Sequence, residues 1–328
     1  MHFPTLDQIV LETIDLYSKE KHLPHIDLNA FHTPLVVGSN NGYYTWRILF
    51  RSTPAYFAVE SEVDAKLENI PQITDVVVVS ASGEKHAPII LATAKRHGKK
   101  TFLISSSEKS QGRDIADSSI IMPKIREPYT YNTSTYFGYM LAETPDLDLS
   151  ALKEFLTGTI LDTLSFRIEW NEVRNLAQNH PFEQDISHSF DMTERIDFRD
   201  FSSFFLVLPD QFVLLREMME VKFIELFGRK IARDIFSYEQ MKHATTVVQD
   251  ERELFICFGN TENARYWAHQ VNLPIFDASS YAAMMLLGYY VIGMIQSALP
   301  PYFEESIEDY CIRAKAQSGF DIKPWVEV

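Results

Sequence analysis

The sequence predicts an α/β protein with two lobes, each formed by a parallel β-sheet with helices on both faces. Short apolar runs typical of buried strands alternate with segments whose apolar residues recur at helical spacing. The chain has 328 residues and is 46% hydrophobic, enough for about two domains with a large core. An apolar strand followed by a turn and a helix occurs at 34–50 and again at 203–227, which suggests an internal duplication.

The first lobe is expected to follow a leading amphipathic helix at residues 6–17. Its strands are short and rich in β-branched residues, and the segments between them have helical patterns. The expected strands are 34–38, 56–59, 75–79, 101–104 and 119–122, and the expected helices are 43–50, 84–97 and 130–141. Strands that alternate with helices in this way form parallel sheets, because a parallel return needs a crossover connection.

A helical connector is predicted over residues 146–179, where Asp148 and Ser150 supply capping side chains at its start. The polar stretch 178–199 is predicted to be a loop. The second lobe has expected strands at 203–209, 254–258 and 273–276, and expected helices at 211–227, 261–269 and 281–295. These patterns divide the chain into a helical segment at 1–30, a first domain at 31–145, the connector at 146–200, a second domain at 201–300, and a C-terminal helix and tail at 301–328.

The net charge of −15 at pH 7, with a pI near 5.1, limits the partners of the chain. An acidic surface repels nucleic acid and anionic membranes, so neither is expected as a partner. An anionic substrate would need a local positive pocket within this negative field. Cys257 and Cys311 form no disulfide framework, which favours a reducing, cytoplasmic location.

No membrane anchor, metal site or cofactor is expected. The N-terminus lacks the basic start and apolar core of a signal peptide, and the apolar stretch 284–295 is too short to span a bilayer. The histidines lack metal-ligand spacing, and Asp185, His188 and Asp191 are interpreted as a chance cluster in a loop. No glycine-rich dinucleotide fingerprint follows a strand.

Hydroxyl groups follow the apolar run Val76–Val79, in the segment Ser80-Ala81-Ser82-Gly83. Hydroxyls and backbone N–H groups at a strand-to-helix turn form an anion site, because the helix N-terminus carries partial positive charge. The same residues also suit an ordinary turn. Ser39 and Asp210 likewise follow apolar strands, and ligands of open parallel sheets bind beyond the carboxyl ends of the strands. The segment is therefore either a phosphate site or a plain connecting loop.

Lys222 and Glu225 lie at i and i+3 of the helix expected at 211–227, so they share one face. Such a pair is commonly a solvated surface ion pair, but the neighbouring residues here are mostly apolar. A carboxylate beside an ammonium in an apolar setting can act as a base. His243, in the segment Met241-Lys242-His243, either serves in proton transfer near neutral pH or is a surface histidine.

These motifs resemble those of tandem sugar isomerase (SIS) domains. The segment Ser80-Ala81-Ser82-Gly83-Glu84 is similar to the Ser-x-Ser-Gly-x-Thr loop that holds the phosphate of a sugar phosphate in that family. The second lobe resembles the isomerase half of glucosamine-6-phosphate synthase. The similar segments there are Asp210-Gln211 with Lys222-x-x-Glu225, Met241-Lys242-His243, and the closing stretch 322–327. The resemblance covers about residues 35–328.

The resemblance implies flavodoxin-like lobes, a homodimer, no cofactor and a sugar-phosphate substrate. The implied reaction is aldose–ketose isomerisation, or isomerisation or deamination of an aminosugar phosphate without a glutaminase domain. A non-catalytic sugar-phosphate sensor that regulates a partner protein is the alternative. The implied catalytic residues are Glu225 as the base between C1 and C2, Lys222 beside it, His243 of the partner subunit as the group that opens the sugar ring, and Lys323 near the carbonyl. The implied phosphate ligands are Ser39, Ser80, Ser82, Gly83, Lys85, Asn132 and Thr133.

The sequence departs from the family pattern at three places. Lys85 replaces the usual Thr of the loop, and an ammonium pairs with phosphate as a point charge. Ala244-Thr245 replaces the usual Gly-Pro, and Met218, next to Glu217, stands where a glutamate is usual. No amidotransferase half accompanies these lobes, so a full synthase is not expected.

Overall fold

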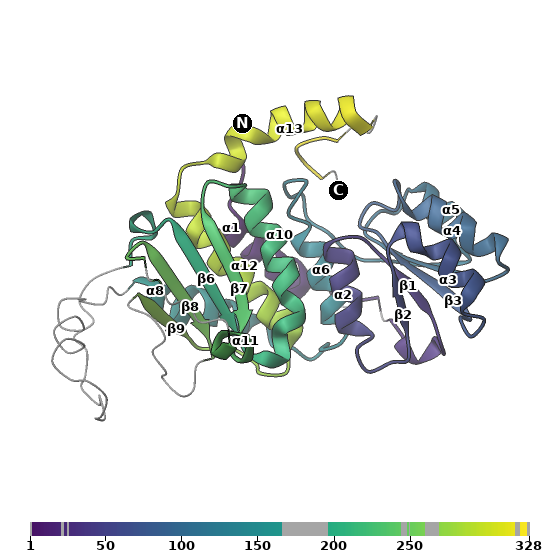
Figure 1. The fold of residues 1–328 in the computed structure, drawn as a ribbon, viewed down its shortest axis with the longest axis horizontal. Helices are drawn as coiled ribbons and strands as arrows, with labels where there is room; N and C mark the ends of the chain where they lie inside the picture. Colours follow the sequence, from purple (N-terminus) through teal and green to yellow (C-terminus); the bar gives the residue numbers. More distant parts are fainter. Residues whose placement is uncertain are drawn as a thin grey trace.

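The computed structural model describes residues 2–20, 23–24, 26–165, 196–243, 248, 250–259, 269–318 and 322–326. It confirms the predicted α/β class, because it contains two parallel sheets with helices packed against them (Figure 1). Four expectations concern segments that lie wholly or largely outside the described residues: the loop at 178–199, the group Asp185, His188 and Asp191 within it, the pair Ala244-Thr245, and the helix at 261–269. The second half of the predicted connector, at 166–179, also lies outside them. These expectations stay predictions.

The first sheet has the strand order β2-β1-β3-β4-β5, and all its strands are parallel. The strands are β1 (Leu35–Val37), β2 (Tyr56–Ala58), β3 (Asp75–Val79), β4 (Lys100–Ser105) and β5 (Ser118–Ile121), each within one residue of the prediction at either end. In β3, Val76 and Val78 join the apolar cluster on one face, whereas Val77 and Val79 join the larger core on the other. Side chains of a strand alternate in this way, so an apolar run needs cover on both faces.

The helices of the first lobe are α2 (Asn41–Leu49), α3 (Val63–Asn69), α4 (Ala87–Arg96), α5 (Gln111–Ile115) and α6 (Thr133–Leu141). The short helix α3 was not expected, because only Val63 and Leu67 of it are buried. Helix α4 begins three residues later than expected, where Pro88 suits the first turn. Helix α6 also begins three residues late, because Asn132 has the left-handed φ of 47°.

The second sheet is also parallel, with the order β7-β6-β8-β9, and so repeats the order of the first four strands of the first sheet. Its strands are β6 (Ser203–Leu208), β7 (Ala232–Ser237), β8 (Glu253–Phe258) and β9 (Gln270–Leu273). The strand β7 was not expected, and β9 precedes the expected 273–276. Both are edge strands and carry polar side chains, so the apolar signal of a buried strand is weak in them.

Of the helices expected around the second sheet, those at 211–227 and 281–295 are found, whereas the short helix after β7 was not expected. Residues 210–227 form a 3-10 turn (Asp210–Leu215) that continues as α10 (Arg216–Phe227), and α11 (Tyr238–His243) follows β7. The connector contains α7 (Leu149–Phe155), a π-helical turn (Leu156–Ile160) and α8 (Leu161–Ser165). Asp148 caps α7 as expected, because its Oδ1 accepts a hydrogen bond from the backbone N–H of Ala151 at 2.9 Å.

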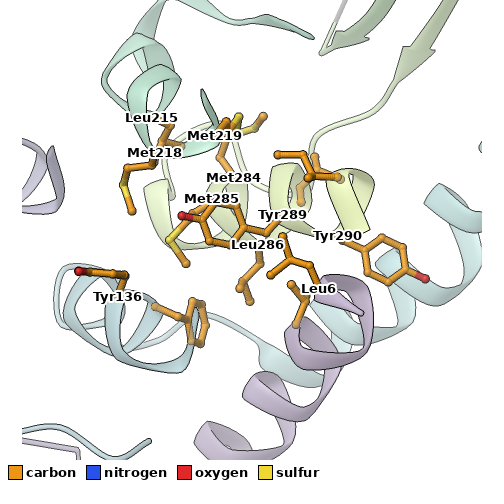
Figure 2. Packing of buried hydrophobic residues seen from close by; sticks show 14 of the residues in the cluster. Leu6, Tyr136, Leu215, Met218, Met219, Met284, Met285, Leu286, Tyr289 and Tyr290 are labelled. Carbon is orange, nitrogen blue, oxygen red and sulfur yellow. The ribbon is translucent and has the colours of Figure 1, made fainter. Parts of the chain in front are cut away.

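The helix α12 (Tyr281–Ala298) joins the two lobes into one core. It packs against α1 (Leu6–Lys19), α6 and α10, and Figure 2 shows its side chains packed with Leu6 and Met218, with Tyr136 of α6 nearby. A Cβ on Gly293 would lie 2.0 Å from the backbone nitrogen of Asp7, so glycine permits the close approach of α12 to α1.

Helix α12 is longer than the expected 281–295. Among the described helices it alone has the length and composition to cross a membrane, with 18 residues and a mean hydropathy of 1.3, but 78% of it is buried inside the protein. A helix that is apolar on all sides is expected at the centre of a large core. The last helix, α13 (Tyr302–Ser318), crosses from the second-sheet lobe toward the first (Figure 1).

Candidate functional site

A hollow of about 360 Å³ lies at the carboxyl ends of β1 and β3. The order of the first sheet reverses between these two strands, which is where parallel α/β sheets bind ligands. Ser39, Ser80 and His86 line this hollow, and Tyr136 of α6 joins them. We call it the switch-point hollow. Ala87, the first residue of α4, also lines it, so the positive end of a helix dipole borders the space.

The loop after β3 is held by its own hydroxyl groups. The backbone N–H of Gly83 donates to Ser80 Oγ at 3.1 Å, and that of Glu84 donates to Ser82 Oγ at 3.3 Å. Both hydroxyls therefore keep their O–H for a ligand. Gly83 has a φ of 68°, and a Cβ there would lie 2.5 Å from Ser110 Oγ, so packing requires this glycine. Ser82 and Gly83 do not line the switch-point hollow.

Glu60 and His86 form a charged pair in the switch-point hollow that was not expected from the sequence. His86 Nδ1 contacts Glu60 Oε2, and both residues line the hollow. Among its described lining residues, Glu60 carries the only carboxylate and His86 is the only basic group. Glu60 lies two residues after the end of β2, so it too is at the carboxyl end of a strand, where parallel sheets bind ligands.

Lys222 and Glu225 form a buried pair and not a solvated one. The Lys222 side chain is fully buried, and its Nζ donates to Glu225 Oε2 at 2.6 Å and to the carbonyl oxygen of Thr130 at 2.5 Å. The Glu225 side chain is 27% exposed and lines a second hollow, of about 680 Å³, between the end of α10 and α13. We call this the α10–α13 hollow. Burial raises the pKa of Glu225, although the Lys222 charge and hydrogen bond oppose the shift.

The N-terminus of α6 is occupied by a buried carboxylate. Glu127 is 1% exposed and accepts hydrogen bonds from the backbone N–H of Thr133 at 2.7 Å and from Ser134 Oγ at 2.6 Å. Asn132 donates its side-chain N–H to the carbonyl of Tyr129. Asn132 and Thr133, the expected phosphate ligands of this region, line none of the three described hollows. Burial raises the pKa of Glu127, and the hydrogen bonds from α6 oppose this.

The C-terminal segment brings Lys323 toward the loop that ends at α6. The backbone N–H of Tyr129 donates to the carbonyl of Pro324 at 2.9 Å, and that of Val326 donates to the carbonyl of Glu127 at 2.9 Å. Lys323 precedes Pro324 and is exposed. Lys85 lies at the same loop, because its Nζ donates to Tyr129 Oη at 3.2 Å.

A third hollow, of about 440 Å³, lies between the β3–α4 loop and α13. Lys85, His86, Tyr310 and Arg313 are among its lining residues, and we call it the Lys85 hollow. It shares His86 with the switch-point hollow, and it shares Tyr310 and Arg313 with the α10–α13 hollow. The Lys85 hollow thus adjoins each of the other two.

Tyr136 of α6 is a buried tyrosine at the switch-point hollow. Burial first, and the Glu225 charge second, raise the pKa of this tyrosine, which lines the hollow. The structure therefore places Ser39 and Ser80 in the switch-point hollow, Lys85 in the Lys85 hollow and Glu225 in the α10–α13 hollow.

His243 lies away from this region within the same chain. Helix α10 returns from β6 to the parallel strand β7, so Glu225 at its end is near the amino edge of the second sheet. His243 ends α11, which follows β7 and so lies at the carboxyl edge, opposite α13 in Figure 1. Strands of six residues separate these edges by about 20 Å. The His243 side chain is exposed.

A cluster of possible metal ligands lies elsewhere on the surface. Asp64, Glu68 and His97 have side-chain ligand atoms within 4.8 Å of one another, which the sequence spacing did not suggest because His97 comes from the end of α4. His97 Nε2 already contacts Asp64 Oδ1 at 2.9 Å, and both carboxylates are exposed. The cluster lies outside the three hollows.

Comparison with solved structures identifies sugar-phosphate enzymes of the same fold. The chain is similar to glucosamine-6-phosphate deaminase from Thermotoga maritima, with a TM-score of 0.57 and 13% identity over 90% of this chain and 95% of that one. It is also similar to the C-terminal domain of glucosamine-fructose-6-phosphate aminotransferase from Francisella tularensis, with a TM-score of 0.55 and 13% identity over 89% of this chain and 94% of that one.

These similarities confirm the predicted fold of two parallel sheets flanked by helices. No protein-family model matches the sequence, and no curated protein sequence matches it. At 13% identity a shared fold does not by itself establish a shared reaction, because function depends on the site.

Proposed function

We propose that the protein binds a sugar phosphate and moves a proton between its C1 and C2, either as an aldose–ketose isomerase or as an aminosugar-phosphate isomerase or deaminase that needs no glutamine. The observation that carries this proposal is the buried Lys222–Glu225 pair, whose carboxylate is partly exposed to a hollow. A regulatory sensor needs no base with a raised pKa, so the pair favours catalysis over sensing.

The roles of the residues follow from their environment. A phosphate in the switch-point hollow would accept O–H bonds from Ser39 and Ser80 and would face the N-terminus of α4. Lys222 holds Glu225 in place from its buried side, because its ammonium is fixed by the carbonyl of Thr130. The raised pKa brings the Glu225 carboxylate nearer to the working pH of a base that takes and returns a proton.

We propose further that two copies of the chain form the working unit in the cytoplasm. His243 is exposed at the edge of the second sheet away from Glu225, so it would serve the site only from a partner subunit. A monomer in sedimentation at micromolar concentration would contradict this shared site.

Proton exchange in heavy water tests the proposed reaction. Glucose 6-phosphate, fructose 6-phosphate and glucosamine 6-phosphate would be screened for binding by calorimetry and for deuterium incorporation at C2 by NMR. Incorporation with at least one bound sugar phosphate is expected. Binding without any incorporation would reject the enzyme and leave the sensor as the function.

The mutation Ser39→Ala is expected to weaken sugar-phosphate binding by about 1.5–3 kcal/mol, the contribution of a hydrogen bond to a charged group. The free sugar should bind wild type and variant equally, because it lacks the phosphate. Calorimetric titration with glucose 6-phosphate and with glucose measures both. Ser82→Ala is the matched comparison and should have the smaller effect, since Ser82 lies outside the switch-point hollow. Equal loss for both ligands would contradict a phosphate at Ser39.

The mutation Glu60→Gln is expected to tighten glucose 6-phosphate binding about fivefold, or about 1 kcal/mol, because it removes a negative charge from the hollow. It also frees His86 from its carboxylate partner. Glu62→Gln removes the same charge from a side chain that is 49% exposed and does not line the hollow, so it is the control. Equal affinities of wild type and Glu60→Gln would place the phosphate elsewhere.

A further inference from the structure

The Lys85 hollow is positively charged although the chain has a net charge of −15. Lys85 reaches it from the loop after β3, and Arg313 reaches it from α13 on the other side. None of the described residues that line it carries a carboxylate. In a protein with a net negative charge, a concave site lined by two cationic side chains from separate segments attracts an anion.

Arg313 is available to such an anion. Within the described part of the chain, this exposed side chain makes no hydrogen bond or ion pair. On its other side Arg313 lines the α10–α13 hollow with Glu225 and Glu305. The α10–α13 hollow is lined by these two carboxylates together with Arg229 and Lys230, whereas the described lining of the Lys85 hollow holds Lys85 and Arg313 without any carboxylate.

Of the residues expected to bind phosphate, only Ser39, Ser80 and Lys85 line one of the three hollows, and they are divided between two of them. Ser39 and Ser80 line the switch-point hollow, whereas Lys85 lines the Lys85 hollow, and only His86 borders both. A phosphate held by the serines would therefore leave Lys85 for a different group. Lys85 is fixed in this position by Tyr129, to which its Nζ donates at 3.2 Å.

We infer that the substrate carries a second anionic group, a carboxylate or a second phosphate, which binds between Lys85 and Arg313. The inference rests on the proposed function, because it assumes that the first phosphate occupies the switch-point hollow. The planar guanidinium of Arg313 would bind two oxygens of the second group, and the ammonium of Lys85 would add a point charge from the opposite wall. Tyr310 and Gln317 line the same space and supply further hydrogen-bond donors.

Pairs of ligands that differ in one anionic group test this inference. Calorimetry would compare glucose 6-phosphate with 6-phosphogluconate, and fructose 6-phosphate with fructose 1,6-bisphosphate. Wild type is expected to bind at least one doubly anionic ligand about tenfold or more tighter than its singly anionic partner. The variants Lys85→Gln and Arg313→Gln should lose this preference and keep their affinity for the monophosphates within about twofold.

Arg252→Gln is the control for a general loss of positive charge, because the Arg252 side chain is 68% exposed and lines none of the three hollows. Monophosphate binding without any preference for a second anionic group would overturn the inference and leave the proposed function intact. Equal weakening of both ligand types by Lys85→Gln and Arg313→Gln would also overturn it, because these cations would then hold the first phosphate. Failure of every sugar phosphate to bind would overturn the proposed function and the inference with it.

Discussion

Replacement of Glu225 by Gln is expected to lower turnover by about 10²–10⁴-fold, the usual contribution of general acid–base catalysis, while sugar-phosphate binding stays largely unchanged. The amide keeps the shape of the side chain and can still accept a hydrogen bond from Lys222, whose Nζ lies 2.6 Å from Glu225 Oε2. It cannot take a proton from carbon. Deuterium incorporation at C2, followed by NMR with the sugar phosphate that binds best, measures the loss directly.

The pH profile provides an independent test of the same carboxylate. Burial raises the pKa of Glu225 above its ordinary value of 4.5, and the base acts only when it is ionised. The ratio kcat/KM should therefore rise with pH through a pKa higher than that of an exposed glutamate. Glu305→Gln is the matched control, because Glu305 lines the same hollow without contacting Lys222. An unchanged exchange rate in Glu225→Gln would exclude Glu225 as the base.

Replacement of Lys222 by Met is expected to lower the free energy of unfolding by about 2–4 kcal/mol, because it leaves two acceptors without their donor. Lys222 is fully buried, and its Nζ binds both Glu225 and the carbonyl of Thr130. This lysine thus connects α10 of the second lobe to the loop before α6 of the first. Urea unfolding, followed by circular dichroism, measures the change.

A double variant separates the ion pair from the loss of packing. Lys222→Met combined with Glu225→Leu removes both charges, and replacement of a whole buried pair costs less than removal of one partner. The double variant should therefore recover part of the stability that Lys222→Met loses. Lys230→Met changes an exposed lysine near the end of the same helix and should alter stability by less than about 0.5 kcal/mol. A loss below about 1 kcal/mol in Lys222→Met would show that the pair is not a structural link.

The sequence alone predicted the elements whose local pattern is strong. The strand at 75–79 was predicted to the residue, because four successive valines suit only a strand with cover on both faces. The strand β7 was not predicted and β9 was placed three residues too late, because both carry polar side chains that weaken the apolar signal of a strand. The starts of α4 and α6 were each three residues early, because loop conformations at 84–86 and at Asn132 delay the first helical turn.

The sequence indicated which residues could belong to the candidate site, but it did not show which of them lie together in the fold. The spacing of Lys222 and Glu225 showed that they share a helix face, but burial decided that they form a desolvated pair. Ser39 and Ser80 each follow a predicted strand, which placed both at the carboxyl ends of the strands, and in the structure they line one hollow. Glu60 and His86 come from separate segments, so only the fold reveals that they meet there.

By itself the sequence determined the α/β class and most strands and helices, because hydrophobic periodicity and turn chemistry act between near neighbours in the chain. Tertiary structure alone decided which charges meet. In the folded chain Lys85 lines a different hollow from Ser39 and Ser80, and Arg313 of α13 lines the same hollow as Lys85. Glu127 accepts hydrogen bonds at the N-terminus of α6. These contacts join residues far apart in the chain, where packing and not local pattern fixes the distance between charges.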